Sequence, residues 1–138
     1  MIRWIIIASA LIAPSPSFSQ PFHDQIPTTF QGTFAPSISE CKAEYGVEVI
    51  EVKADGIHYY EGDDYLLIGV SFDGASTKSE EFIPLFNGRF TGRSETRILG
   101  EVTARMEMEN PNTLIRYTMN SDGEADPKPV NIWVRCPK

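Results

Sequence analysis

Apolar and polar residues alternate along most of the chain after residue 28, which is the pattern of β-strands that bury one face. The clearest run is Thr96–Glu109, in which the even-numbered positions from Ile98 to Met108 are apolar or glycine and most odd-numbered positions are polar. Runs of this kind predict eight strands, at residues 28–34, 47–53, 57–61, 65–73, 80–86, 96–109, 113–119 and 130–136. The segment 35–43 is predicted to be a loop with at most one helical turn.

The period of two also predicts which side chains share a face. In the run 65–73, the even-numbered residues from Leu66 to Phe72 fall on one face. In the last run, we expect the even-numbered residues from Val130 to Cys136 to face the interior, because they are the apolar set.

Turn-forming pairs separate several of these runs. Asp55-Gly56 and Asp73-Gly74 predict tight turns, and Asn87-Gly88 is the strongest hairpin signal in the chain. Pro84 lies inside the run 80–86, so that strand is expected at an edge or beside a bulge.

Short connections between successive strands favour antiparallel neighbours. A meander of this kind has two exposed edges unless its first and last strands meet. We therefore predict an all-β fold, an up-and-down barrel of about eight antiparallel strands that is closed or partly open. A β-sandwich is the alternative.

The N-terminus has the three parts of a secretory signal peptide. Arg3 gives a basic start, Trp4–Ala13 is apolar, and small residues precede a cut before Gln20. The apolar run is shorter than the roughly 20 residues of a membrane-spanning helix, although an uncleaved anchor is the alternative. The expected organisation is a signal peptide at 1–19, a flexible lead at 20–27 and a single β domain at 28–138, in a soluble protein that is periplasmic or secreted.

Cys41 and Cys136 are the two cysteines of the chain. In an oxidising compartment two cysteines permit one intramolecular bridge, and we predict a structural disulfide between them. Because they lie near the two ends of the predicted domain, this bridge would enclose most of it.

The composition is that of a globular protein, with 41% hydrophobic and 22% charged residues. The chain has 12 basic and 19 acidic residues, and its formal charge of −7 becomes −8 once Arg3 is removed. Such acidity disfavours nucleic-acid binding and favours either simple solubility or attraction to a basic partner.

The motif Phe30-x-Gly32-x-Phe34 resembles the first strand of lipocalin-like (calycin) barrels, which carries Gly-x-Trp. In that superfamily a basic residue near the end of the last strand packs over the aromatic ring. The resemblance implies a barrel fold in which Arg135 stacks on Phe34 and closes the barrel. The chain is also similar to uncharacterised exported bacterial proteins that have a Gly-x-aromatic first strand and a terminal Arg-Cys.

Aromatic side chains with a polar group are the best candidates for contacting a ligand or partner. They are Tyr59, Tyr60, Tyr65, Tyr117 and Trp133. We therefore expect a non-enzymatic binding or interaction module for a small apolar ligand or an envelope protein, with an inhibitor of a basic protein as one specific form.

The alternative function is a small hydrolase or isomerase that uses His58 with a nearby carboxylate, for which Glu61 is the candidate considered. Strand geometry opposes this for Glu61, which falls on the other face from His58. The segment Asn120–Asp126 has oxygen donors at alternate positions but lacks the glycine and glutamate spacing of a calcium loop. We predict no metal, no cofactor and no catalytic residue.

Overall fold

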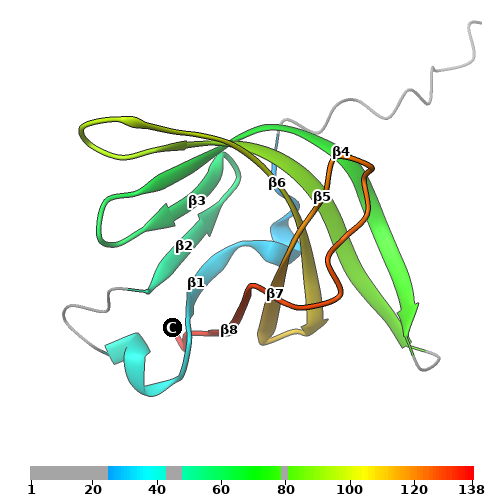
Figure 1. Ribbon diagram of the computed structural model, residues 1–138. Coiled ribbons are helices and arrows are strands. Elements are labelled where there is room, and N and C mark those ends of the chain that lie inside the picture. The colour runs from blue at the N-terminus through cyan, green and yellow to red at the C-terminus, as the bar shows by residue number, and fades with distance from the viewer. Residues whose placement is uncertain (1–24, 43–47, 79–80) are drawn as a thin grey trace, which may run out of the picture.

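The computed structural model describes residues 25–42, 48–78 and 81–138 (Figure 1). The strands in this part of the chain are β1 (Gly32–Ala35), β2 (Ile50–Lys53), β3 (Gly56–Tyr59), β4 (Asp64–Lys78), β5 (Glu81–Arg93), β6 (Ile98–Asn110), β7 (Thr113–Thr118) and β8 (Asn131–Arg135). Two single-turn 3₁₀ helices, η1 (Thr28–Phe30) and η2 (Ser39–Lys42), precede and follow β1.

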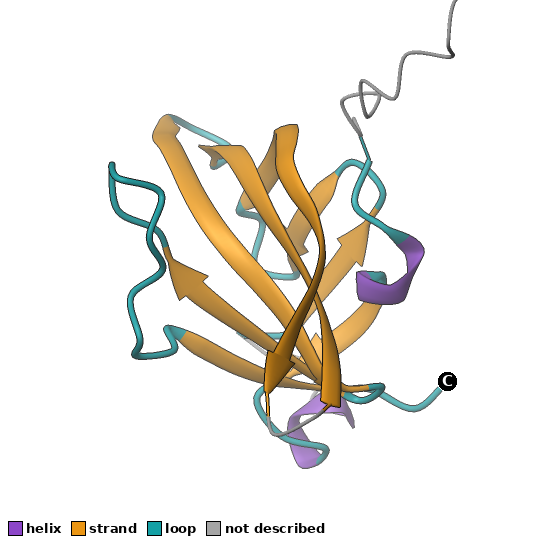
Figure 2. Cartoon of the chain, turned by 90° about the vertical axis from the view of Figure 1, so that its right-hand side faces the viewer, coloured by secondary structure: helices purple, strands orange, loops and turns teal. Residues whose placement is uncertain are grey.

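Each strand pairs antiparallel with the next, and β1 pairs with β8, so the sheet is a closed barrel. The closing pairs are Phe34 with Arg135 and Ala35 with Val134. Figure 2 shows the strands crossing obliquely around the barrel, with the two short helices beside them. The predicted up-and-down barrel is therefore confirmed, and the β-sandwich alternative is wrong.

The predicted disulfide is also confirmed. Cys41 lies within η2, Cys136 follows β8, and the two sulfur atoms are bonded, with the Cα atoms 5.6 Å apart. The backbone N–H of Cys136 donates to the carbonyl of Thr33, which extends the closing seam beyond the last strand. The disulfide and this hydrogen bond therefore both reinforce the seam where β1 and β8 close the barrel.

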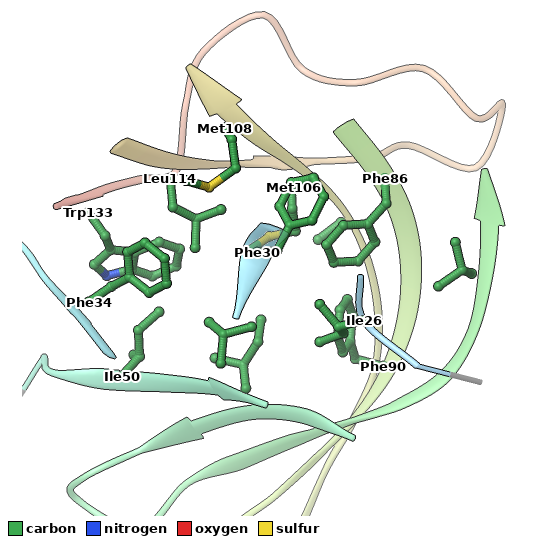
Figure 3. Packing of buried hydrophobic residues seen from close by; sticks show 14 residues of the cluster. Ile26, Phe30, Phe34, Ile50, Phe86, Phe90, Met106, Met108, Leu114 and Trp133 are labelled. Carbon is green, nitrogen blue, oxygen red and sulfur yellow. The ribbon is translucent and has the colours of Figure 1, made fainter. Parts of the chain in front are cut away.

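A cluster of buried hydrophobic side chains fills the inside of the barrel (Figure 3). Its members are Ile26, Phe30, Phe34, Ile50, Val52, Ile57, Val70, Phe86, Phe90, Ala104, Met106, Met108, Leu114 and Trp133. Phe30 of η1 and Phe86 of β5 meet edge to face, with ring centroids 4.7 Å apart. Each large side chain buried in this way contributes about 1.5–3 kcal/mol through the hydrophobic effect.

Two predicted turns are wrong, because the strands run through them. Asp73-Gly74 lies within β4 and Asn87-Gly88 within β5. A side chain at Gly88 would place its Cβ 2.9–3.0 Å from the rings of Phe90 and Phe86. Glycine at this position therefore makes room for aromatic packing, and Asn87 accepts a hydrogen bond from Arg105 on the neighbouring strand.

The first predicted strand is wrong over its first half. Thr28–Phe30 forms η1, which inserts Phe30 into the core, and β1 begins at Gly32. Gly32 has a φ of 144°, a backbone conformation that suits glycine. This change of direction lets η1 fold across the end of the barrel instead of continuing the strand. The helical turn expected after β1 is confirmed as η2.

The expected inward face of the last strand is reversed. Trp133 is 2% exposed and belongs to the core, whereas Ile132 is 56% exposed. Since Trp133 and Arg135 share a face, Arg135 is also directed to the inner side, and Cys136 lies on the outer one. The larger indole displaces the smaller aliphatic residues from the interior.

Strand β4 changes face part-way along its length. Register shifts between Leu67 and Gly69 and between Val70 and Phe72 mark β-bulges in its pairing with β5. As a result Leu67 and Val70 both contact the core, whereas Phe72 is 47% exposed. The single apolar face predicted for 65–73 is therefore wrong.

The predicted signal peptide and most of the predicted lead lie outside the described residues. Ile26, which falls within the predicted lead at 20–27, is 1% exposed and belongs to the core. Its backbone N–H donates to the carbonyl of Ala54 in the β2–β3 turn. The packed barrel therefore includes residues before 28.

Candidate functional site

The two ends of the barrel differ in chemistry. Arg135 and Asn131 stand at opposite ends of β8, and both lie on its inner face with Trp133 between them. We call the end beside Arg135 the η1 end and the end beside Asn131 the open end.

Arg135 closes the η1 end. Its guanidinium lies 4.8 Å from the centroid of the Phe34 ring, so the predicted stack is present. Nη1 donates to the carbonyl of Gln31 at 2.6 Å and Nη2 to that of Thr29 at 3.1 Å. Nε donates to the carbonyl of Pro111 at 2.9 Å. One side chain thus joins the last strand to the η1 segment and to the β6–β7 turn.

A pocket of about 420 Å³ opens at the η1 end, where β5 and β6 separate. The β5–β6 ladder begins at Leu85 and Glu107, and in the described chain residues 81–84 pair with β4 alone. Pro84 offers no backbone N–H for a ladder on this side. The pocket is lined by Thr29, Glu81, Phe82, Pro84, Met108, Glu109, Asn110, Pro111 and Arg135.

Phe82 is the most exposed large hydrophobic residue of the described chain, at 81%. It lines this pocket together with the carboxylate-bearing residues Glu81 and Glu109. An exposed ring beside two carboxylates can pack on an apolar or cationic group of a partner.

The open end carries a different set of side chains on its inner wall. Arg116 of β7 is paired directly with Asn131 of β8. The Arg116 guanidinium carbon lies 6.0 Å from the centroid of the Trp133 ring. Tyr59 and Tyr65 pack edge to face with centroids 5.8 Å apart, and both contact the core. Burial raises the pKa of Tyr59, and the charge of Arg116 offsets part of this shift.

The structure thus brings together three of the five predicted aromatic residues, Tyr59, Tyr65 and Trp133. Tyr60 is 60% exposed and lies beyond the end of β3. Tyr117 alternates with the inward Arg116 and so lies on the outer face of β7. Arg116 was missed by sequence reasoning, although it is in phase with Leu114, which is buried.

His58 is held between two carboxylates on the outer face of the barrel. Nδ1 lies 2.7 Å from Asp64 and Nε2 lies 2.8 Å from Asp55. Burial alone would lower the pKa of His58, but the hydrogen bonds to Asp55 and Asp64 outweigh it and raise the pKa. Both ring nitrogens act as donors in the imidazolium form, so neither is available as a general base. The predicted alternative, catalysis by His58 with a nearby carboxylate, stays a prediction.

Oxygen atoms of the 120–126 loop bind backbone groups of the loop itself. Asn120 Oδ1 accepts from the N–H groups of Asp122 and Glu124, and Asp126 Oδ1 accepts from that of Lys128. Within the described ranges, no group of three His, Cys, Asp or Glu side chains is arranged to hold a metal ion.

No family model, curated protein or solved structure matches this chain. Among the residues that the structure describes, no helix has the length and hydropathy needed to cross a bilayer.

Proposed function

We propose that this protein is an exported, non-enzymatic interaction module that binds a basic segment of a protein partner at the pocket of the η1 end. The observation that carries this proposal is Phe82, which is 81% exposed beside a pocket that Glu81 and Glu109 also line. Exposed aromatic residues are typical anchors of protein interfaces, because they bury a large area at a low entropic cost.

The filled core supports a protein partner over a ligand held deep in the barrel. Trp133, Phe34 and Phe86 are all at most 2% exposed and occupy the interior that a deep ligand would need. Recognition at the η1 end then takes place at the surface, where a partner side chain can enter the 420 Å³ pocket.

The partner segment is expected to be extended and basic. Glu81, Phe82 and Ile83 form an edge beyond the start of the β5–β6 ladder, and their backbone groups can pair with an additional strand that ends at Pro84. Glu81 and Glu109, in a chain of formal charge −7, favour lysine or arginine on that strand. An inhibitor of a basic enzyme is one specific form of this function.

Export and membership of the calycin superfamily are part of the proposal. The signal-like N-terminus and the disulfide support export. Phe34 follows Gly32 by two residues, as the aromatic residue does in the calycin motif. The stack of Arg135 on Phe34 therefore supports a calycin-type closure of the barrel. Such membership implies the fold and leaves the function to the site.

The test uses two ten-residue peptide probes, one alternating lysine with threonine and one alternating glutamate with threonine. Fluorescence anisotropy should show binding of the lysine peptide alone, and this binding should weaken as salt is raised. Glu81→Lys with Glu109→Lys should abolish it, whereas the matched reversal Glu124→Lys in the exposed 119–130 loop should have a much smaller effect. Equal binding of both peptides would contradict the proposal.

A second variant tests the aromatic anchor. Phe82→Ala should weaken binding of the lysine peptide by about tenfold or more, the size expected of an interface anchor. Phe72→Ala removes another exposed aromatic ring, 47% exposed, and should leave binding unchanged. Equal losses in the two variants would show that Phe82 has no special role.

A further inference from the structure

The inner wall of the open end contains a positive charge for which the described residues supply no carboxylate. Arg116 shares its face with the buried Leu114, and its guanidinium carbon lies 6.0 Å from the centroid of the Trp133 ring. Among the described residues, no carboxylate lies within ion-pair distance of its guanidinium. A partly desolvated guanidinium without an anion is costly, and a bound carboxylate would satisfy it with two parallel hydrogen bonds.

A second polar group beside Arg116 has no hydrogen-bond partner among the residues that the structure describes. Asn131 lies directly opposite Arg116 on β8, and its Oδ1 is buried and accepts no hydrogen bond from the described part of the chain. A buried acceptor without a donor is unusual in a folded protein. A ligand that carries an N–H or O–H group next to its carboxylate would supply this donor.

Apolar wall on the same inner face continues from these two residues toward solvent. Val102 of β6 is paired with the core residue Phe90, yet it is 41% exposed. Thr118 is exposed although its partner Ala104 is buried in the core. Solvent therefore reaches the inner wall at this end, and a short apolar chain can lie on it.

We propose that the open end binds a small amphipathic carboxylate with an N–H donor beside the carboxylate, the chemistry of an N-acyl amino acid. Arg116 pairs with the carboxylate, Asn131 Oδ1 accepts the amide N–H, and the acyl chain runs toward solvent against Val102. Tyr59, whose phenol is neutral at neutral pH, offers an O–H donor near Arg116. This site is separate from the protein-binding pocket of the η1 end.

Two carboxylates near Tyr59 limit which anions bind. Glu48 and Glu61 act electrostatically on the Tyr59 phenol, and both are exposed. They repel multiply charged anions more than a monocarboxylate, so citrate should bind more weakly than an N-acyl amino acid.

The experiment titrates the exported protein with N-octanoylglycine by calorimetry and follows the fluorescence of Trp133. Two analogues serve as controls: N-octanoylglycinamide lacks the carboxylate, and N-octanoylsarcosine keeps the carboxylate but lacks the N–H. We expect the amide to bind at least about 30-fold more weakly, because it leaves Arg116 unpaired. We expect the sarcosine analogue to bind about fivefold more weakly, because it leaves Asn131 Oδ1 unpaired.

Variants assign each preference to its residue. Arg116→Gln should abolish the preference for the acid over the amide, whereas Arg89→Gln, which removes an exposed arginine on the outer face, should keep it. Asn131→Ala should bind the glycine and sarcosine compounds equally. Equal binding of acid and amide by the unaltered protein would overturn the proposal, even if the Arg116 variant failed to fold. A failure of the lysine peptide to bind at the η1 end would not affect this result.

Discussion

Phe34 and Arg135 are neighbours on the two strands that close the barrel, and the Arg135 guanidinium lies 4.8 Å from the centroid of the Phe34 ring. The same guanidinium also donates to the carbonyls of Gln31, Thr29 and Pro111. First strand, last strand and η1 therefore depend on one side chain, which makes the closing seam the natural place to test the fold.

Replacing Arg135 with methionine should destabilise the protein by about 2–4 kcal/mol, because it removes three charge-assisted hydrogen bonds and the stack on Phe34. Arg135→Lys should recover only part of this loss, since an ammonium group cannot make the planar fork. Urea unfolding followed by tryptophan fluorescence measures both changes. Arg89→Met is the control, because its exposed ion pair with Glu101 should contribute less than about 1 kcal/mol. Equal effects at positions 135 and 89 would contradict a structural role for the seam.

The position of Arg135 over the closing seam also requires glycine at position 32. An added Cβ would lie 2.5 Å from Arg135 Nη1, and the residue has a φ of 144°. Gly32→Ala should therefore cost about 1–3 kcal/mol through backbone strain, with a further loss from displacement of Arg135. Gly69→Ala is the matched control, because nothing lies within 4 Å of an added Cβ there. A thermal unfolding scan of the two variants should separate them by several degrees, and equal midpoints would count against the close approach.

The disulfide closes the seam covalently across a sequence separation of 95 residues. Removing it with the double change Cys41→Ser and Cys136→Ser should lower the free energy of unfolding by about 4–5 kcal/mol in the chain-entropy model. Reduction of the unaltered protein should produce a similar fall in the midpoint of chemical denaturation. An unchanged midpoint after complete reduction would show that the barrel closes without help from the bridge.

The sequence predicted the number of strands, their antiparallel order and the bridge, because alternation and cysteine content are local or compositional signals. It failed where a turn signal competed with packing. Asn87-Gly88 is a strong hairpin pair, but here Gly88 makes room for Phe86 and Phe90 within a continuous strand. Tertiary packing decides whether such a glycine forms a turn or makes room for neighbouring rings, and the Asn-Gly pair alone does not show which.

Only part of the candidate site was predicted, because residue type can be read from the sequence but the pairing between strands cannot. Tyr59, Tyr65 and Trp133 were identified by residue type, whereas Arg116 and Asn131 became visible only once the register placed them opposite each other. Which residues of β8 face the interior depends on whether Trp133 or the aliphatic residues beside it are buried, and here Trp133 is buried. Because Trp133 is buried, Asn131 and Arg135 also lie on the inner face of β8. One polar side chain therefore stands at each end of the barrel.

The clamp around His58 predicts a pH-dependent stability. Because Asp55 and Asp64 raise the pKa of His58 above its unfolded value, the clamp stabilises the fold fully below about pH 6.5, and this contribution is lost as pH rises through the folded pKa. The hydrogen bond from His58 lowers the pKa of Asp55, so the contribution of Asp55 is present above its unfolded value of 3.8 and is lost as pH falls. The clamp should therefore be most effective between about pH 4 and 6.5.

Urea unfolding of the unaltered protein and of His58→Gln at pH 5.5 and 8.5 checks this window. The stability difference between the two proteins should be larger at pH 5.5, by about 1 kcal/mol or less, because Asp55 is exposed and solvent screens the pair. Asp55→Asn should reduce the pH dependence and leave the Asp64 contact in place. A His58→Gln difference that grows toward pH 8.5 would mean that the neutral imidazole, and not the imidazolium, is the form that stabilises the barrel.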